Sequence, residues 1–403
     1  MASTPQPLPP TIRALGWTSF LTDLSSEAIY PLLPGFVKGL GGTSLDIGLI
    51  DGVANAVAAV VRLPSGIVSD SVGRRPLILL GYGFSSVVRP LMGLVASPLG
   101  VLVVRAADRF GKGIRNAPRD ALVADLVEPE QRGRAFGRIR GLDHAGAAVG
   151  PLVAMLFLLL FPGRDRTLFL LTILPGLATL AVIWRFVRDA PRRTSAPRAL
   201  AAGLSGSQGW LLACVAIWAA GAASEQFLLL RAAELGTPAA LIPLLWFAIS
   251  LAKGVAASRA GPLADRISPQ RALATGWLVF AAAYGGLALA TSLALALPLV
   301  IAVGVGYGIA EPAERKLVAA LAPAGRHGGA FGWYALVQGL LALPAGLLAG
   351  TLWDHESAGP SWAFATTAGL ALAACGLLAV MPSSPGPQAE ESAAGPGADD
   401  ASP

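Results

Sequence analysis

Six charged side chains lie along one face of a segment that is otherwise apolar enough to form a helix inside a membrane. Within residues 101–124 these are Arg105, Asp108, Arg109, Lys112, Arg115 and Arg119. At about 100° per residue, the six positions fall within about 120° of one helix face. Because a charge at the bilayer centre costs about 3 kcal/mol or more, such side chains should point into a bundle or an aqueous cavity. The pattern predicts a protein that handles something polar or ionic within a membrane.

Two acids in the first apolar segment are candidates to face these bases. Asp23 and Glu27 are four residues apart and therefore share one helix face. We expect Asp23 or Glu27 to take up a proton, with Arg105 and Asp108 in the same network, because burial and nearby bases act oppositely on a carboxyl group. A fixed ion pair with Arg105 or Arg109 is the alternative.

Other polar side chains within apolar segments are candidate contacts for a solute. They are Tyr30, Arg109, Lys112, Asp143, His144, Glu225, Tyr307 and Glu311. The excess of base over acid predicts an anionic or carboxylate-bearing solute held by bidentate contacts. The alternatives are internal pairing of the bases, a structural role for His144, and pairing of the two glutamates with Lys253 or Arg315.

Composition limits the class of protein. The chain has 403 residues, 54% hydrophobic and 13% charged, and its mean hydropathy is +0.62. Soluble domains carry about 25% charged residues, so the deficit predicts an integral membrane protein. The net charge is +6, and the basic residues cluster between apolar segments on alternate sides of the predicted membrane. This distribution argues against nucleic-acid binding. We expect no metal site, cofactor, phosphate-binding loop, cleavable signal peptide or enzymatic activity.

Apolar stretches long enough to cross a bilayer number about twelve, in two groups of six. The first group is 14–36, 47–69, 76–96, 99–119, 138–160 and 167–187, and the second is 210–232, 241–259, 270–291, 293–318, 330–352 and 361–381. We therefore predict an N-terminal six-helix bundle over 1–187, a cytoplasmic linker over 188–209, a C-terminal six-helix bundle over 210–382 and a disordered tail over 383–403. The basic linker predicts that both termini are cytoplasmic.

The two halves of the sequence repeat each other. Gly-Ile-Val-Ser-Asp ending at Asp70 aligns with Gly-Pro-Leu-Ala-Asp ending at Asp265, 195 residues later. Leu122 and Leu317, and Ala135 and Ala330, begin two further matches with the same spacing. A six-plus-six duplication is typical of secondary transporters, whose substrate site lies between the halves near the midplane.

The loop after the second predicted span resembles the signature of the major facilitator superfamily, G-x-L-x-D-R-x-G-R-R. The matching residues are Gly66, Asp70, Gly73, Arg74 and Arg75. Ser71 stands where the family usually has a basic residue, and Asp265 belongs to a degenerate second copy. The resemblance implies a charge cluster that holds the outward-open state closed on the cytoplasmic side. An ordinary basic loop is the alternative.

Two further motifs are similar to that family. The fourth span begins Leu102-x-x-Arg105, and the resemblance ties this Arg to proton coupling. The fifth span resembles the antiporter signature G-x8-G-x3-G-P-x2-G-G and departs from it at Ala154 and Met155. The matching residues are Gly137, Gly146, Gly150 and Pro151. Generic packing through small residues is the alternative.

The resemblance implies a fold in which the first, fourth, seventh and tenth helices line a central cavity. We therefore expect an all-α membrane protein of about twelve helices that exports a small organic solute in exchange for protons. The alternative is transport, import included, of an anionic metabolite or a siderophore-type metal chelate. A membrane-embedded enzyme or receptor is disfavoured. We expect a monomer in a bacterial-type inner membrane, with protons, solute and lipid as its partners.

Overall fold

The computed structural model describes residues 8–127, 129–189, 206–222, 224–266, 268–322, 327–357 and 359–381, all in helices and short connections. Most of the predicted linker 188–209 and the whole predicted tail 383–403 lie outside these ranges. Over the described residues the predicted all-α membrane fold class is confirmed.

The first half of the chain forms six rods in the part that the structure describes. They are α1 (Pro10–Ile29) continued by η1 (Tyr30–Leu32) and α2 (Leu33–Gly39); α3 (Ser44–Val72); α4 (Arg74–Val88) with η2 (Arg89–Leu94); α5 (Pro98–Leu126); α6 (Pro129–Leu160); and α7 (Asp165–Leu171) with α8 (Ile173–Phe186). The 3-10 turn after α1 contains Pro31, whose missing N–H and fixed φ disfavour a continuous helix.

The second half repeats this order over its own described residues. Its rods are α9 (Gly206–Gly221) with α10 (Gln226–Glu234); η3 (Ala239–Leu241) with α11 (Ile242–Arg266); α12 (Pro269–Leu289); α13 (Leu293–Leu321); α14 (His327–Asp354); and α15 (Gly359–Ala379).

Ten of these rods are long and apolar enough to cross a membrane by length and composition, counted over the described residues. The other two are residues 10–39 and α5, which carry Asp23 and Glu27 and the stripe of bases. Their charged side chains lower the mean hydropathy of these two segments below that of a typical membrane span, although both segments are packed among the other helices. The protein is therefore a multi-pass membrane protein whose least apolar helices lie inside its bundle.

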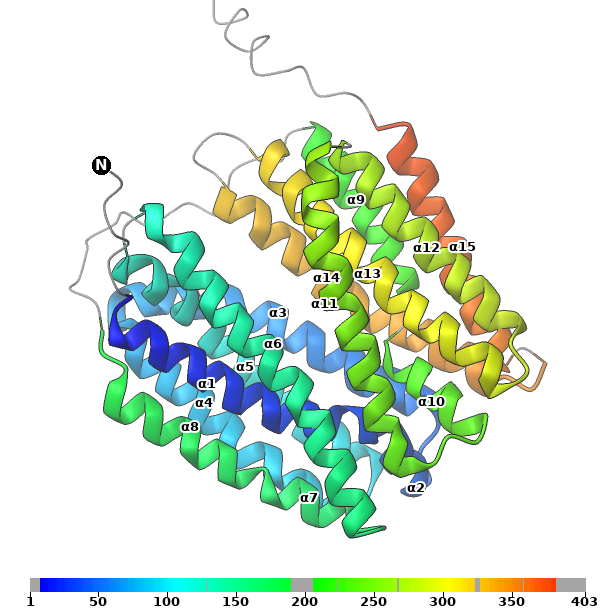
Figure 1. The fold of residues 1–403 in the computed structure, drawn as a ribbon, viewed down its shortest axis with the longest axis horizontal. Helices are drawn as coiled ribbons and strands as arrows, with labels where there is room; N and C mark the ends of the chain where they lie inside the picture. Colours follow the sequence, from blue (N-terminus) through cyan, green and yellow to red (C-terminus); the bar gives the residue numbers. More distant parts are fainter. Residues whose placement is uncertain are drawn as a thin grey trace, which may run out of the picture.

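The helix ends define two sides of the molecule. We call the linker side the one where α1 begins at Pro10, α8 ends at Phe186 and α9 begins at Gly206. The far side is the one where α2 ends at Gly39 and α10 ends at Glu234. In Figure 1 the two halves lie at an angle to each other and converge near α2 and α10, on the far side.

Small residues allow the two halves to approach closely along α3 and α14. The backbones of Gly48 and Gly346 touch, and a Cβ placed at Gly52 would lie 2.7 Å from the Cα of Leu343. On the far side, Asp354 at the end of α14 accepts hydrogen bonds from the backbone N–H groups of Ser44 (3.1 Å) and Leu45 (2.8 Å) at the start of α3. The halves are therefore joined by backbone contact along one seam and by a helix cap on the far side.

Candidate functional site

A cavity of about 290 Å³ lies between the two halves; we call it the central cavity. Its walls come from α1, α3 and α5 on one side and from α11, α13, α14 and the α9–α10 connection on the other. The lining residues are Glu27, Tyr30, Asp51, Asn55, Arg109, Ala222, Ser224, Glu225, Trp246, Tyr307 and Ala342. Of the candidate solute contacts, the structure brings together Tyr30, Arg109, Glu225 and Tyr307 here.

Glu27 is held by neutral donors. The indole Nε1 of Trp246, from the other half, donates to Glu27 Oε2 at 2.8 Å, and Ser26 Oγ donates to Glu27 Oε1 at 3.2 Å. The Trp246 ring also packs against the Tyr30 ring, with centroids 4.9 Å apart. Glu27 therefore links the two halves through an indole rather than through an ion pair.

Asp51 is the partner of Arg105. Their side chains form an ion pair with 3.9 Å between Arg105 Nη2 and Asp51 Oδ1. Asp51 Oδ2 also accepts hydrogen bonds from Ser224 Oγ at 2.8 Å and from Asn55 Nδ2 at 3.2 Å. The fixed partner of Arg105 is thus an acid on α3, and neither Asp23 nor Glu27 supplies it.

Glu225 forms an ion pair with Lys253. This is the pairing that the sequence analysis gives as the alternative to a solute contact. The Lys253 ammonium lies 4.5 Å from the centroid of the Tyr307 ring and 5.7 Å from that of Trp246. This cluster places a neutralised acid and two aromatic faces on the C-terminal wall of the central cavity.

Arg109 lines the central cavity without a protein partner. Its side chain is 9% exposed, and its Nε is buried and unbonded. Over the ranges that the structure describes, its guanidinium forms no hydrogen bond or ion pair. It therefore differs from the paired acids and bases around it.

A second, smaller cavity of about 70 Å³ lies within the N-terminal half; we call it the polar pocket. Its lining residues are Ser19, Thr22, Asp23, Arg62, Tyr82, Lys112, Arg115, Asn116, Arg119, Asp120, Arg140 and Asp143. Asp23 on α1 and Asp143 on α6 both line this pocket. Lys112 and Asp143, expected at the solute site, lie instead in this pocket.

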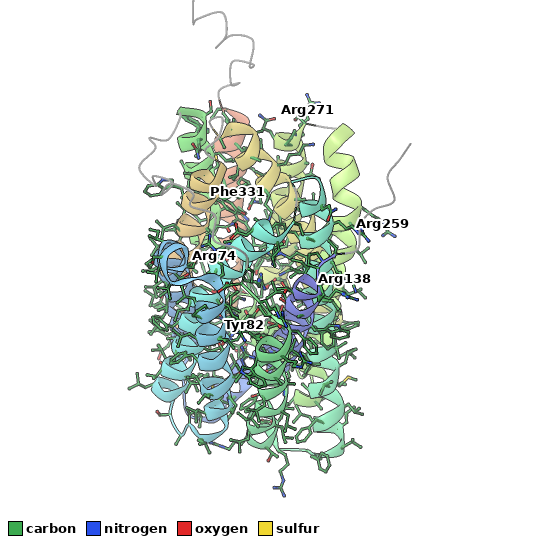
Figure 2. The ribbon with its side chains drawn as sticks, turned by 90° about the vertical axis from the view of Figure 1, so that its left-hand side faces the viewer. Arg74, Tyr82, Arg138, Arg259, Arg271 and Phe331 are labelled. Carbon is green, nitrogen blue, oxygen red and sulfur yellow. The ribbon has the colours of Figure 1, made fainter. Side chains whose placement is uncertain are left out.

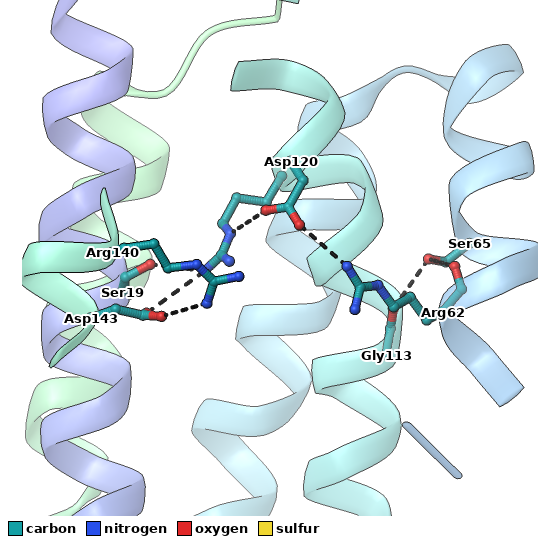
Figure 3. Close-up of polar contacts among 8 residues, drawn as sticks. Ser19, Arg62, Ser65, Gly113, Asp120, Arg140 and Asp143 are labelled. Atoms are coloured by element: carbon teal, nitrogen blue, oxygen red, sulfur yellow. Dashed lines mark hydrogen bonds and ion pairs between the residues drawn. The ribbon is translucent and has the colours of Figure 1, made fainter. Parts of the chain in front are cut away.

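Ion pairs connect the polar pocket across three helices (Figure 3). Asp143 pairs with Arg140 at 3.2 Å and with Arg119 at 3.9 Å. Arg119 also meets Asp120 at 3.3 Å, and Asp120 meets Arg62 at 3.5 Å. Bases and acids therefore alternate from α6 through α5 to α3.

Asp108 belongs to a third cluster. Arg89 Nη2 lies 2.9 Å from Asp108 Oδ1, and Arg89 Nη1 donates to Ser25 Oγ at 2.7 Å. Both charged side chains are buried. Asp108 is therefore the anion of an internal ion pair with Arg89 of η2, which continues α4.

Two candidate contacts lie in neither cavity. His144 is exposed on α6, and Glu311 is exposed on α13, where it pairs with Arg315 at 2.8 Å. Helical spacing identified the charged stripe of α5 but did not show which neighbouring helix covers each remaining position.

Comparison with known proteins decides the family. The family model described as Major Facilitator Superfamily matches residues 15–343 and, in a second match, residues 209–400. An uncharacterized MFS-type transporter of Methanocaldococcus jannaschii is 31% identical over 352 residues, or 85% of this chain and 88% of that protein. The chain belongs to the Major Facilitator Superfamily. It is therefore a membrane transporter of small molecules and not an enzyme.

Other members of the superfamily match over different extents. The multidrug resistance protein MdtH of Cronobacter sakazakii is 30% identical over 147 residues, or 35% of this chain and 37% of that protein. The solved structure of the nucleoside transporter NupG has a TM-score of 0.77 at 11% identity, over 93% of this chain and 100% of that chain. The structural likeness shows the fold alone.

The superfamily signature at the α3–α4 turn is fixed by an acid from the end of α8. Asp189 Oδ1 accepts from the backbone N–H groups of Arg74 at 3.1 Å and Arg75 at 2.8 Å. Gly73 has a φ of 105°, which favours glycine, and Arg74 Nε lies 3.3 Å from Asp125. The side chains of Asp70 and Asp265 lie outside the described part of the chain.

The glycines of the antiporter signature differ in what they contact. A Cβ at Gly150 would lie 2.6 Å from the carbonyl oxygen of Leu24, and one at Gly146 would collide with the carbonyl oxygen of Phe20, both on α1. At Gly137, no atom of a neighbouring element in the described part of the chain lies within 4 Å of such a Cβ. Two of the three glycines therefore bring α6 against the backbone of the helix that carries Asp23 and Glu27.

Some residues of the site lie outside the predicted set. Asp51 is signalled by the sequence, because it is an acid within an apolar span. Nothing local marked Asp189 as the acceptor at the α3–α4 turn, since it lies 115 residues from Arg74. Such partners are set by how the helices pack.

Proposed function

We propose that this superfamily member is a proton-coupled antiporter that exports a small organic solute through the central cavity by alternating access. The observation that carries the proposal is that Asp23 and Asp143 line the same small polar pocket. The pocket lies between α1 and α6, the helix with the antiporter signature.

Two carboxyl groups that share a small buried pocket favour the uptake of a proton by one of them, because two carboxylates close together repel each other. One proton can be held by the pair, while Lys112 and Arg119 nearby favour its release. Burial and these bases therefore act in opposite directions, and a small movement of α1 against α6 would change the balance. This gives the Asp23–Asp143 pair the properties of a proton-coupling site.

The polar pocket and the central cavity share α5. Lys112 lines the first and Arg109 the second, three residues apart on one helix. Glu27, one turn from Asp23 on α1, is bonded to Trp246 of the other half. Binding of a solute between the halves and protonation of Asp23 can therefore act on the same two helices.

Export is supported by the antiporter signature and by the similarity of part of the chain to MdtH, a protein named for multidrug resistance. The orientation follows from charge. On the linker side, Arg74 and Arg271 lie in the first turns of α4 and α12, and Arg138 and Arg259 lie in the linker-side halves of α6 and α11 (Figure 2). The positive-inside rule then makes this side cytoplasmic in an inner membrane. We propose that the monomer is the transporting unit, with the solute cavity between its own halves.

The proposal is tested by flux in proteoliposomes with and without an imposed pH gradient, using ethidium, chloramphenicol and benzoate as solutes. We expect at least one solute to move in the direction opposite to the protons when a pH gradient is imposed. In Asp23→Asn and Asp143→Asn, this flux should lose its dependence on the pH gradient. Glu311→Gln, an exposed acid outside both cavities, is the matched control and should transport as wild type. Flux independent of the pH gradient, or retained coupling in both Asn variants, would contradict the proposal.

A further inference from the structure

We propose that Arg109 binds the carboxylate of the transported solute, so that the substrates are small organic anions with a planar apolar body. The inference deepens the proposed function and rests on it in one respect, which is that the solute occupies the central cavity. It concerns what binds there, and neither the direction of transport nor the coupling ion enters it.

Arg109 differs from the other arginines of the α5 stripe. Arg105 pairs with Asp51, Arg115 donates to Ser85 Oγ at 2.8 Å, and Arg119 pairs with two aspartates. Arg109 has the same helical environment but no partner within the described ranges. Its side chain is nine-tenths buried, and it forms part of the cavity wall.

The acids around Arg109 are already engaged. Asp108, which interacts electrostatically with Arg109, is bonded to Arg89. Asp51 is held by Arg105 and by two neutral donors, Glu225 by Lys253, and Glu27 by Trp246 and Ser26. Moving any of them to Arg109 would break those contacts. Because a buried guanidinium without a counter-charge is unfavourable, its presence in the wall of a transport cavity points to a negative charge brought by the solute.

The chemistry of the cavity narrows the class of solute. The planar fork of an arginine matches a carboxylate, which it can hold through two parallel hydrogen bonds. The rings of Tyr30, Trp246 and Tyr307 line the same space and suit an apolar, planar body. A volume of about 290 Å³ is at the small end for organic ligands, which suits a metabolite-sized acid.

The test is a binding measurement on the purified full-length protein in detergent, without a pH gradient. The probes are benzoate, phenylacetate and hexanoate, each compared with its amide, which has the same shape and no charge. We expect at least one carboxylate to bind and its amide to bind weakly or not at all. Arg109→Gln should weaken carboxylate binding about 10- to 100-fold, because a charged hydrogen-bonding partner is lost.

Two further variants separate binding from folding. Arg109→Lys keeps the charge but loses the fork, so its affinity should fall between those of wild type and Arg109→Gln. Arg13→Gln makes the same change at an exposed position at the start of α1 and should bind as wild type. Ligand-free Arg109→Gln should be at least as thermostable as wild type, since it removes an unpaired buried charge. A structural arginine would give the opposite result.

The outcomes separate this inference from the proposed function. The assignment of Arg109 is overturned if no carboxylate binds at concentrations up to about 10 mM, if amides bind equally well, or if Arg109→Gln binds as wild type. Flux driven by a pH gradient and restricted to neutral or cationic solutes would leave the proposed function standing and remove this inference. Carboxylate binding that depends on Arg109, together with flux that is insensitive to the pH gradient, would support the role of Arg109 and contradict the proposed proton coupling.

Discussion

At the scale of single residues, Asp108 and Arg89 are the most deeply buried ion pair of the N-terminal half, with side chains 5% and 7% exposed. Arg89 is further bonded to the carbonyl oxygen of Thr22 and to Ser25 Oγ on α1. The pair therefore ties α4, α5 and α1 together, and its geometry favours a structural role over proton transfer.

We predict that Asp108→Asn destabilises the protein more than it changes coupling. Removing one partner leaves the Arg89 guanidinium buried without a counter-charge, which costs about 3–5 kcal/mol. The melting temperature in detergent should fall clearly, while flux per folded molecule keeps its pH-gradient dependence. The matched control is Glu311→Gln, which breaks an exposed pair worth about 0–1 kcal/mol and should leave the melting temperature almost unchanged. Normal stability with lost coupling would instead make Asp108 part of the proton path.

At this scale, the sequence predicts which way the charged side chains of α5 face but not which residues they contact. The helical period of the α5 charges predicted that they face inward, and Arg105, Asp108, Arg109, Arg115 and Arg119 are all buried. Which acid meets which base depends on the rotation of one helix against another. That rotation places Asp51 at Arg105 and Asp143 at Arg119, and no local signal in the sequence encodes it.

At the scale of helices, the α1–α6 contact depends on glycines that the structure distinguishes. We predict that Gly150→Ala is destabilising by about 1–3 kcal/mol, because the added methyl group would overlap the Leu24 carbonyl oxygen and force the helices apart. Because α1 and α6 carry the two acids of the polar pocket, coupling should weaken as well. Melting temperature and pH-driven flux in proteoliposomes measure the two effects.

Gly137→Ala is the control within the same signature. Among the residues that the structure describes, no neighbouring element comes within 4 Å of its added Cβ, and Ala is favoured over Gly in a helix by up to about 1 kcal/mol. We therefore expect equal or slightly greater stability and unchanged flux. Equal damage from both changes would mean that the signature acts through helix propensity and not through the contact with α1.

The helices themselves were largely predictable, because an apolar run of membrane length has few other uses. Boundaries were less so. The predicted span 14–36 is part of a rod that runs over residues 10–39 and changes to a 3-10 turn at Tyr30, and the predicted span 47–69 lies inside a helix that extends from Ser44 to Val72. The ends of helices that project beyond the membrane are set by caps, such as the Thr43–Asp46 capping box at the start of α3. A hydropathy profile does not detect such caps.

At the scale of the whole molecule, the halves share a topology but divide the chemistry. The C-terminal half packs aromatic rings, such as the stacked pair Trp218 and Trp277, where the N-terminal half packs ion pairs. Its buried acid Glu314 accepts hydrogen bonds from Trp277 and Tyr334. This asymmetry suits a mechanism in which one half handles protons and the other supplies an aromatic wall.

Alternating access requires the far side to open, so the contacts that close it should set the balance between states. Asp354 belongs to the C-terminal half, yet it caps the start of α3 and lies 3.7 Å from Lys38, both in the N-terminal half. Asp46 caps the same helix from within its own half, by accepting from the Thr43 backbone N–H at 2.7 Å. Two acids at one helix start therefore differ in whether they join the halves.

We predict that Asp354→Ala shifts the population towards a state open on the far side, whereas Asp46→Ala does not, although each removes a carboxylate from the same helix start. Spin labels at Gly39 and Ala239, one in each half, should show a larger share of long distances in Asp354→Ala by pulsed electron resonance. Labels at Gly39 and Arg164, both in the N-terminal half, should keep their distance in every variant. The same shift in both alanine variants would mean that the start of α3 had simply frayed, and no shift in either would place the closing contacts in the α3–α14 glycine seam.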